Sequence, residues 1–369
     1  MFSLGEVLGA YDPAAPLERA RTIPSAWYTD PRVHELERSR VFGNTWQFVS
    51  RVDQLAEMGS FITADVAGEP ILVARGDDGS LRAFYNVCRH HAARVEPRAE
   101  GTASRFRCPY HGWTYALDGS LKALPGFDGV EDFDKSRNGL CPLRVETWEQ
   151  FVFVCGGQSA PALGEYLGDL TGQAAPLGIS KLKFAQRRTY DVRCNWKVFV
   201  DNFLDGGYHV PYIHKGLNSV ISYKDYRIEC GERFCVQSSP LVQGGGQDEV
   251  AKVRGGTHAY YFWVYPNFML NCYKGYADVN VVLPAGVDRC VVLFDFYFAP
   301  GEGTGGGLQD QSINVADVVQ QEDIDICESV QRGLSSRSYD VGRLSVEREA
   351  GEHLFHRLLA RGLRDEPAT

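Results

Sequence analysis

Two short stretches of this chain, Cys-Arg-His at 88–90 and Cys-Pro-Tyr-His at 108–111, constrain its structure more than any other feature of the sequence. Each stretch offers one thiolate and one imidazole to a common site. Two thiolates on one iron and two imidazoles on the other are the ligands of one type of [2Fe-2S] cluster. The pattern therefore predicts such a cluster with four ligands, Cys88, His90, Cys108 and His111.

A structural zinc site is the alternative interpretation, because Cys₂His₂ also binds zinc tetrahedrally. Zinc modules usually pair like ligands, whereas here each short stretch mixes the two residue types. The spacing therefore favours the iron cluster. Two imidazoles in place of two thiolates remove negative charge from the cluster and raise its reduction potential, which is the property of a Rieske cluster. His91 falls outside the pattern and is expected to pack beside the ligands.

Composition narrows the class of protein that surrounds this site. The 369 residues are 44% hydrophobic and 23% charged, which is ordinary for a globular protein. A formal net charge of −9 argues against nucleic acid as a partner, because binding to phosphates depends on Lys and Arg. No apolar run is long enough for a membrane span, and the first residues lack the pattern of a signal or transit peptide. We therefore expect a cytoplasmic protein whose cysteines are mostly reduced.

Residues 46–156 are predicted to form a compact all-β domain around the cluster. Apolar and polar residues alternate in this range, and Asp-Gly dipeptides at 78–79 and 118–119 predict two hairpins that bring the ligand pairs together. Residues 1–45 are expected to be a lead-in segment that packs on the second domain, residues 157–369. The stretch 156–178, rich in Gly, Pro and Ala, marks the boundary between the two domains.

Residues 157–369 are predicted to form a second domain of a different class. Strand patterns dominate its first part and two helical patterns end it, so we predict an α+β domain in which helices pack on an antiparallel sheet. The predicted strands are 188–192, 259–265, 268–273, 279–283 and 290–298. The predicted helices are one that begins at Asn195, one over 313–334 and one over about 349–363.

Two histidines in this second domain indicate a second metal site. His209 and His214 are five residues apart, which on a regular helix separates them by about 140° in azimuth. Gly206, Gly207 and Pro211 interrupt a regular helix, so both imidazoles can converge on one ion. Ordinary polar or packing roles for the two histidines are the alternative.

A carboxylate is the expected third ligand, because two histidines and one carboxylate bind a non-haem Fe(II) and leave positions open for O₂. The helix predicted over 313–334 carries Glu322, Asp323 and Asp325. Its helical neighbours place Asp323 on the apolar face and Asp325 toward solvent. A carboxylate on a buried face needs a cation or a hydrogen-bond partner. We therefore predict Asp323 as the ligand, with Glu322 as the alternative.

With both sites in place, the chain resembles the catalytic α subunit of the Rieske non-haem iron oxygenases over nearly its full length. Three stretches are similar to the choline monooxygenase branch known from plants: DNFLDGGYHVPYIHKG at 201–216, VYPNFM at 264–269 and CESVQRGL at 327–334. The resemblance implies an all-β Rieske domain and a catalytic domain that is helix-grip-like, with an antiparallel sheet and helices. It also implies that His209, His214 and Asp323 hold a mononuclear Fe(II).

The resemblance implies partners as well. Many members are homotrimers in which the cluster of one subunit passes electrons to the iron of its neighbour through an acid, and a separate ferredoxin or flavin reductase supplies those electrons. In many relatives the acid lies three residues before the first iron histidine, a position that Gly206 occupies here. We expect Asp205 to form this bridge, with Asp201 as the alternative. A solvated charge at a helix end is the other interpretation of either aspartate.

The substrate implied by the resemblance is choline, or another quaternary or methylated amine, oxidised with O₂; choline would give betaine aldehyde. Quaternary ammonium groups bind over aromatic faces. Aromatic residues are dense near the proposed iron in sequence, and Tyr261, Trp263 and Tyr265 alternate onto one face of a strand. Plain packing is the alternative, and such residues also suit a flat aromatic ring. The pocket candidates are Tyr208, Tyr212, Trp263, Tyr265, Phe268 and Tyr273.

Four other functions compete with hydroxylation of an amine. Oxidative N-demethylation and hydroxylation of an aromatic ring use the same two iron centres. A Rieske protein that only transfers electrons would contain the cluster and lack the mononuclear iron. A zinc-stabilised binding module would contain neither.

Overall fold

The structure is a computed structural model that describes residues 2–242, 250, 253–301 and 307–364. Its described residues form two compact units, one over 42–163 and one made of 1–41 together with 164–369. These boundaries lie four and seven residues from the predicted ones at 45/46 and 156/157 (45 − 41 and 163 − 156). Residues 156–163, the first part of the Gly- and Pro-rich stretch, belong to the unit over 42–163 because they pack on it, whereas residues 164–178 belong to the other unit. Trp46 Nε1 donates to the carbonyl of Pro161, and the Leu163 N–H donates to Glu146.

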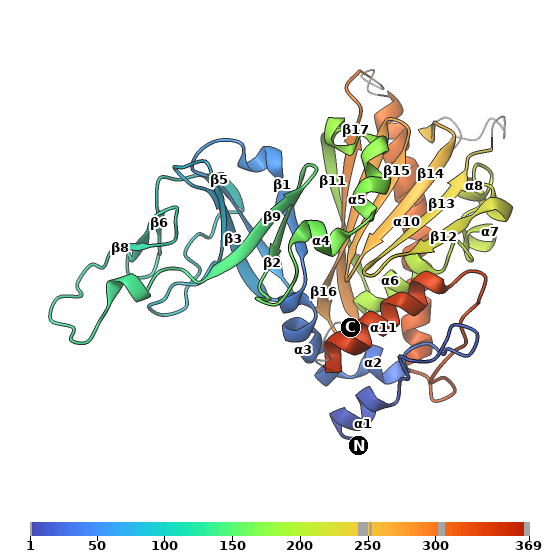
Figure 1. The fold of residues 1–369 in the computed structure, drawn as a ribbon, viewed down its shortest axis with the longest axis horizontal. Coiled ribbons are helices and arrows are strands. Elements are labelled where there is room, and N and C mark those ends of the chain that lie inside the picture. Colours follow the sequence, from blue (N-terminus) through green and yellow to red (C-terminus); the bar gives the residue numbers. More distant parts are fainter. Residues whose placement is uncertain (1, 243–249, 251–252, 302–306, 365–369) are drawn as a thin grey trace. The chain divides into compact units, whose positions relative to one another are not determined.

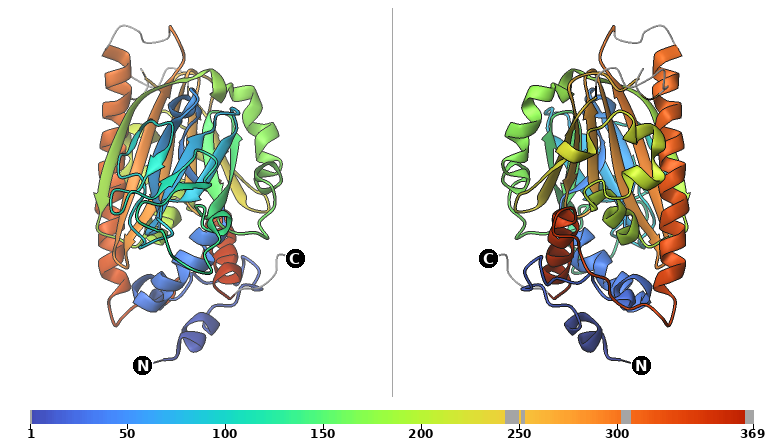
Figure 2. Two further views of the ribbon diagram at one scale, coloured as in Figure 1. Left: turned by 90° about the vertical axis from the view of Figure 1, so that its left-hand side faces the viewer. Right: turned by 90° about the vertical axis from the view of Figure 1, so that its right-hand side faces the viewer.

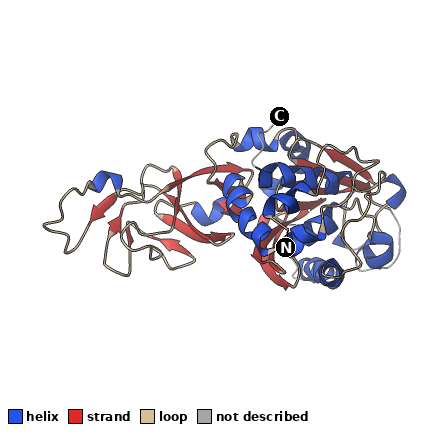
Figure 3. Ribbon diagram, turned by 90° about the horizontal axis from the view of Figure 1, so that it is seen from below, coloured by secondary structure: helices blue, strands red, loops and turns tan. Residues whose placement is uncertain are grey.

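The regular structure of the unit over 42–163 is antiparallel strands, which loops and three short 3-10 helices connect among the described residues (Figure 3). A seven-stranded sheet has the order β1-β10-β9-β4-β3-β2-β5, and a three-stranded sheet has the order β6-β7-β8. The Asp-Gly turns work as predicted, since Gly79 and Gly119 adopt positive φ angles of 76° and 81° between paired strands. The strands are β1 (Gln47–Arg51), β2 (Ser60–Val66), β3 (Glu69–Arg75), β4 (Leu81–Tyr85), β5 (Glu100–Thr102), β6 (Phe106–Arg107), β7 (Thr114–Tyr115), β8 (Leu121–Ala123), β9 (Pro142–Trp148) and β10 (Phe151–Cys155).

The other unit is organised around one antiparallel sheet of seven strands, in the order β11-β17-β16-β15-β14-β13-β12 (Figure 1). Every pair in this sheet is antiparallel, so hairpins connect most neighbours. The strands are β11 (Lys183–Val192), β12 (Arg227–Cys230), β13 (Phe234–Pro240), β14 (His258–Val264), β15 (Phe268–Tyr273), β16 (Tyr276–Gly286) and β17 (Arg289–Phe298). The sequence pattern missed β12 and β13.

Helices pack on this sheet, and the longest of them, α10 (Gly307–Leu334), runs alongside it (Figure 2). The helix α6 (Trp196–Leu204) contacts both α10 and strand β16, and α11 (Ala350–Arg364) contacts α6 and β12. The other α-helices are α1 (Leu4–Gly9), α2 (Ser25–Thr29), α3 (Pro31–Arg40), α4 (Leu163–Leu167), α5 (Leu170–Ala174), α7 (Val210–Ile213) and α8 (Lys215–Asn218).

Residues 1–41 hold the start of α6 through a buried polar group. Glu37 of α3 accepts hydrogen bonds from Lys197 Nζ at 2.6 Å and from Trp196 Nε1 at 2.7 Å, and the three side chains are sealed from solvent. A buried charge needs a partner of this kind. The lead-in segment therefore fixes the position of the helix that precedes the histidine pair.

Strands and helices are segregated in this way throughout the described residues, so the predicted α+β class is confirmed. None of the described helices combines the length and the apolar character that a membrane crossing needs. The cytoplasmic location expected from the sequence stays a prediction.

Candidate functional site

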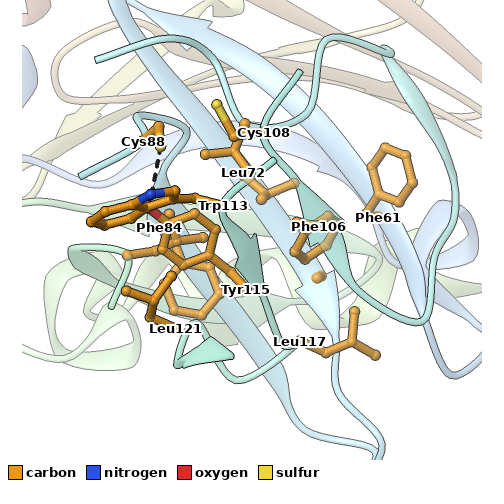
Figure 4. Close-up of a cluster of buried hydrophobic side chains, with 13 residues drawn as sticks. Phe61, Leu72, Phe84, Cys88, Phe106, Cys108, Trp113, Tyr115, Leu117 and Leu121 are labelled. Atoms are coloured by element: carbon orange, nitrogen blue, oxygen red, sulfur yellow. Dashed lines mark hydrogen bonds between the residues drawn. The ribbon is translucent and has the colours of Figure 1, made fainter. Parts of the chain in front are cut away.

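The two loops that carry the predicted cluster ligands are closed by their own backbone hydrogen bonds. The Cys88 N–H donates to the Ala93 carbonyl, and the Cys108 N–H donates to the Trp113 carbonyl, both at 2.8 Å. Both thiols are buried, and they lie over an apolar core that contains Phe61, Phe106 and Leu121 (Figure 4). Short loops on a packed core thus hold the two thiols rigidly.

The histidines of these loops lie toward solvent and next to one another. The rings of His90 and His111 are 4.7 Å apart, and His90 stacks on Trp113 at 4.7 Å with an interplanar angle of 6°. His90 Nδ1 is buried and has no hydrogen-bond partner among the described residues. His91 also lies within this group, although the ligand pattern left it out. Two thiols and two imidazoles in adjacent loops fit the donor set of a Rieske cluster.

The second pair of histidines converges because the helix between them is broken. Helix α6 ends at Leu204, Gly206 and Gly207 adopt positive φ angles of 67° and 68°, and α7 begins only at Val210. His209 immediately precedes α7 and His214 immediately follows it. Their rings are 4.8 Å apart. The interruption predicted from the glycines and the proline therefore brings the two imidazoles together.

Asp323 of α10 lies close to the Nε2 atom of each imidazole. Its Oδ1 lies 3.0 Å from His214 Nε2 and 3.7 Å from His209 Nε2. The three side chains form one of the His and acid groups in the described residues that could hold a metal ion. Burial alone lowers the pKa of His214, but the hydrogen bonds and charges of Asp323 and Glu322 outweigh it and raise that pKa. The site thus favours a cation.

Each of these imidazoles has a carboxylate behind it. Asp205 Oδ2 lies 2.5 Å from His209 Nδ1, and Glu322 Oε2 lies 2.7 Å from His214 Nδ1. A histidine that binds a metal usually donates its other ring N–H to such a group, which fixes the ring and its tautomer. Asn202 of α6 adds a hydrogen bond of 2.7 Å to Asp323 Oδ1. The arrangement turns both Nε2 atoms toward Asp323, the third proposed ligand. Sequence reasoning missed Asn202.

Gly206 cannot carry the acid that many relatives have at its position. A Cβ at this residue would lie 2.1 Å from the carbonyl oxygen of Arg348, and the positive φ angle adds strain for any L side chain. Asp205, the expected substitute, also accepts the backbone N–H groups of Tyr208 and His209 at 3.1 and 3.0 Å. The carboxylate of Asp205 is therefore anchored to the histidine loop.

Asp201, the alternative bridge, belongs to a second group of acids and histidine in the same unit. The hydroxyl of Tyr28 donates to Asp201 Oδ2 at 2.6 Å, and His356 Nε2 lies 3.0 Å from Asp201 Oδ1. Glu352 lies 3.8 Å from the same imidazole nitrogen. These side chains surround one turn of α6 on the N-terminal side of Asp205. The sequence pattern gave no sign of His356 or Glu352.

A cavity of about 130 Å³ opens beside the histidines and Asp323. Residues of α10 line one side of it and residues of strands β14 to β17 line the other. Tyr226 and Tyr261 stack there with ring centres 6.3 Å apart, and the hydroxyls of Tyr261 and Tyr273 lie 2.9 Å apart. Burial raises the pKa of all three phenols, so their rings are neutral at ordinary pH.

Of the six predicted pocket residues, Tyr273 alone is among the described residues that line this cavity. Trp263 and Tyr265 do share a strand face, but they pack against Phe355 of α11 at 5.7 and 6.4 Å. Phe268 is buried in the sheet. Tyr208 and Tyr212 are 45% and 75% exposed, because the broken helix turns them outward. The alternation of aromatic residues identified the correct face of the sheet, but it did not show which of these side chains line the cavity and which pack in the core.

Comparison with known proteins agrees with these two sites. The family profile described as "Rieske [2Fe-2S] domain" matches residues 45–134, and the profile described as "Ring hydroxylating alpha subunit (catalytic domain)" matches residues 179–365. Each profile thus covers one of the two proposed metal sites.

Known proteins and solved structures that are similar to this chain are Rieske oxygenases as well. The chain is 41% identical to the chloroplastic choline monooxygenase of Arabidopsis thaliana, over 98% of this chain and 87% of that protein. It is 33% identical to the carnitine monooxygenase oxygenase subunit of Escherichia coli, over 94% and 95% of the two chains. A crystal structure of a quaternary ammonium Rieske monooxygenase with an inhibitor superposes with a TM-score of 0.84, at 30% identity, over 98% of this chain and 99% of that one.

The cofactors that were predicted from the sequence are those of this family, a Rieske [2Fe-2S] cluster and a mononuclear iron. The residues in both places fit these groups by the chemistry of their donors. Together, the matching profiles and the relatives over nearly the whole length establish that the chain belongs to the Rieske non-haem iron oxygenases, as an oxygenase alpha subunit.

Proposed function

We propose that this oxygenase acts on a small quaternary or methylated amine, and that the group of His209, His214 and Asp323 is where the amine is oxidised. The observation that carries the proposal is the convergence of two carboxylate-backed imidazoles and one carboxylate at the wall of an aromatic cavity. Such a ligand set leaves coordination positions open. The cavity gives an organic substrate access to them.

The proposed ligands divide between the two units. Cys88, Cys108, His90 and His111 would hold the [2Fe-2S] cluster, and His209, His214 and Asp323 would hold the mononuclear iron. When bound, the cluster supplies single electrons and the iron supplies O₂ activation. Around the iron, Asp205 and Glu322 accept the Nδ1 protons and keep both rings oriented, while Asn202 holds one carboxylate oxygen of Asp323 in place.

The ammonium group would bind against neutral tyrosine rings. Tyr226 and Tyr261 present stacked faces inside the cavity, and cation–π attraction is strongest where water is excluded. The relatives named choline and carnitine monooxygenases support a substrate with such a group. With choline, oxygenation of the alcohol carbon gives a gem-diol, which loses water to leave betaine aldehyde. The second atom of O₂ leaves as water after two electrons and two protons have been added.

Electrons would come from a separate ferredoxin or flavin reductase. We further propose a homotrimer, in which the cluster of one subunit serves the iron of the next, with Asp205 as the acid between them. Its carboxylate already contacts His209 Nδ1, so it offers a short path to that ring. Asp201 is the alternative acid. Gly206 is ruled out as the site of a bridging side chain by the Arg348 carbonyl.

Metal analysis is the first test of the iron site. A [2Fe-2S] cluster with a mononuclear iron gives about three iron atoms per chain, whereas an electron carrier with the cluster alone gives about two. The variant His209→Ala is expected to lose one iron and all turnover while the visible spectrum of the cluster is unchanged. His258→Ala, which removes an exposed histidine of the same unit, serves as the control. Full activity in His209→Ala would overturn the iron assignment.

Product analysis tests the substrate class. The protein with a surrogate reductase and O₂ is incubated with choline, carnitine, glycine betaine and benzoate. Oxidation of one of the three quaternary amines, with O₂ consumption matched to product, is the expected result. Oxidation of benzoate alone would replace the proposal with ring hydroxylation. A colourless protein that contains zinc would contradict both.

A further inference from the structure

The aromatic cavity also contains a buried cation. Arg254 lines the cavity and is 8% exposed. Its Nη1 donates to Ser312 Oγ of α10 at 2.6 Å, and its guanidinium carbon lies 4.9 Å from the ring centre of Tyr273 and 4.4 Å from that of Tyr276. The phenols are neutral, so these contacts orient the guanidinium without neutralising it. No carboxylate among the described residues forms an ion pair with it.

Asp278 of β16 is a candidate for a counter-charge because its charge acts on Arg254, but its oxygens already accept other hydrogen bonds. Oδ1 accepts hydrogen bonds from the amides of Asn271 and Asn280, both at 2.8 Å, and Oδ2 accepts one from Tyr276 at 2.7 Å. Burial raises the pKa of this carboxyl group, although its three donors and the charge of Arg254 oppose the shift. Asp278 therefore eases the cost of burying Arg254 without bonding it. The guanidinium keeps N–H donors for a ligand.

A second donor faces the same cavity. Gln320 of α10 is 2% exposed and lines the cavity, and its Nε2 has no hydrogen-bond partner among the described residues. A sealed N–H group without an acceptor is costly unless a ligand or a water molecule meets it. Gln320 lies eight residues from Ser312 and three residues from Asp323 on α10, so its donor faces the cavity between Arg254 and the proposed iron ligands. A purely cationic ligand such as choline would find a like charge at Arg254.

Helix geometry sets the distance between the cation and the proposed iron ligands. Ser312, which bonds Arg254, and Asp323 lie eleven residues apart on α10. At 1.5 Å per residue this is about 16 Å along the helix axis. A ligand that reaches both ends must be elongated. Its positive group would lie against Tyr226 and Tyr261, and its negative group would lie beyond Tyr273, at the guanidinium of Arg254.

We infer that the substrate is a zwitterion, a quaternary or methylated amine that carries a carboxylate several bonds from the ammonium group, and that Arg254 binds this carboxylate. The inference rests on the proposed function and specifies the substrate class of the same site. Arg254 is then a specificity-determining residue. It selects carboxylated amines over choline because a guanidinium can bind a carboxylate through two parallel hydrogen bonds. An uncharged or cationic end group leaves the guanidinium unpaired.

A thermodynamic cycle over one ligand pair and one protein pair tests this inference. The ligands are 4-(trimethylammonio)butanoate and its primary amide, which have the same length and differ in the negative charge. The proteins are the full chain and Arg254→Met, and calorimetry gives the four dissociation constants. The parent protein is expected to bind the carboxylate at least about 30-fold tighter than the amide, since loss of one partner of a buried charge pair typically costs two or more kcal/mol. In Arg254→Met the two ligands are expected to bind equally.

Controls separate recognition from folding. Arg193→Met removes an exposed arginine that pairs with Glu328 of α10 outside the cavity, and it is expected to leave the ratio between the ligands unchanged. Arg254→Lys keeps the charge and should retain part of the preference for the carboxylate. If Arg254→Met does not fold, the ratio in the parent protein and in Arg254→Lys still decides the matter.

The outcomes distinguish this inference from the proposed function. Equal binding of the acid and the amide by the parent protein, or equal weakening of both in Arg254→Met, overturns the role of Arg254 and leaves an amine oxygenase. Failure of both ligands and of choline to bind contradicts the proposed function itself, and this inference with it.

Discussion

The two proposed metal sites differ in what contacts their histidines. At the iron site, Asp205 and Glu322 stand behind the two imidazoles, within 2.5 and 2.7 Å of their Nδ1 atoms. At the cluster, the described residues place no carboxylate against His90 or His111, and their ring contacts are with each other and with aromatic side chains. The two units thus surround the same ligand type with different charge.

The difference follows from what each site has to do. A carboxylate behind an imidazole makes the ring a stronger donor and holds a dication firmly. Around a Rieske cluster, added negative charge would lower the reduction potential that the two imidazoles raise. The cluster loops are also built from neighbouring residues, whereas the proposed iron ligands come from the two ends of α7 and from α10, more than one hundred residues apart. Long-range contacts therefore matter at the iron site and much less at the cluster.

The largest effect is expected from the contact between residues 1–41 and α6. Lys197→Met leaves the Glu37 carboxylate buried with Trp196 Nε1 as its one remaining side-chain partner among the described residues. Breaking a buried pair in this way typically costs about 3–5 kcal/mol. Denaturant unfolding followed by tryptophan fluorescence should show this loss, while the visible circular dichroism of the cluster keeps its midpoint. The double variant with Glu37→Gln should recover part of the loss. An equal shift of the fluorescence and circular dichroism midpoints would contradict the expected difference between the two units.

Removal of one backing carboxylate tests the iron site directly. Glu322→Gln is expected to lower iron affinity by about 10- to 100-fold, because the His214 ring loses the acid that fixes it. Asp325→Asn, on the exposed face of the same helix and bonded by Gln321, is the matched control. Iron content after dialysis against a chelator measures the effect. Equal iron retention in both variants would show that Glu322 has only a surface role.

The proposed cluster site can be tested through Tyr115, whose phenol lies next to a cysteine thiol. The Tyr115 hydroxyl lies 3.3 Å from Cys88 Sγ and accepts the Arg89 N–H at 3.0 Å. Hydrogen bonds to cluster sulfur stabilise the reduced form. Tyr115→Phe is therefore expected to lower the reduction potential in a spectroelectrochemical titration and to cost about 1 kcal/mol of stability. Iron content should stay at the parent value, and an unchanged potential would argue that this hydroxyl does not face the cluster.

The smallest effect concerns pH and Glu352 of α11. Burial, and then the nearby acids, raise the pKa of this carboxyl well above its ordinary 4.5. The folded chain keeps a proton there that the unfolded chain releases, so this contribution to stability is present below about pH 4.5 and is lost as pH rises. Glu352→Gln should therefore gain melting temperature relative to the parent between about pH 5 and pH 8. The groups around Glu352 are Tyr28, Asp201, Asp205, Glu349 and His356.

Glu347→Gln, which changes an exposed acid near the start of the same helix, is the control for that measurement. Its melting temperature should follow the parent at every pH. A difference between Glu352→Gln and the parent that does not vary with pH would show that the carboxyl titrates normally in the fold.

The sequence predicted those parts of the molecule that depend on neighbouring residues. The α+β class, the family and the two cofactors are confirmed, and the Asp-Gly hairpins and the break after α6 are found where the turn residues indicated them. Helical spacing also placed Asp323 on the inner face of α10, where it meets the histidines. The individual ligand assignments at both sites stay predictions for the metal analysis to test.

Long-range features could not be predicted in this way. Nothing in the local pattern of Asn202, Tyr226 or Arg254 indicates that they meet at one cavity, because they come from α6, from a loop before β12 and from the approach to β14. Trp263 and Tyr265, which were predicted to line the pocket, pack against Phe355 of α11, and a long-range contact of this kind is also hidden from the local pattern. Alternation in a strand gives the face of a side chain, but the helix that covers each stretch decides whether the side chain packs or lines a void.

The unit over 42–163 interrupts the other unit in sequence, and its own ends lie together. Strand β1 near its start pairs with β10 near its end, and Trp46 Nε1 reaches Pro161 across that junction. Because its two ends are adjacent, this unit can be treated as an insertion into the other unit. Protein engineers could remove this unit and close the gap with a short linker, or exchange it for the equivalent unit of a relative, while the rest of the chain keeps its fold.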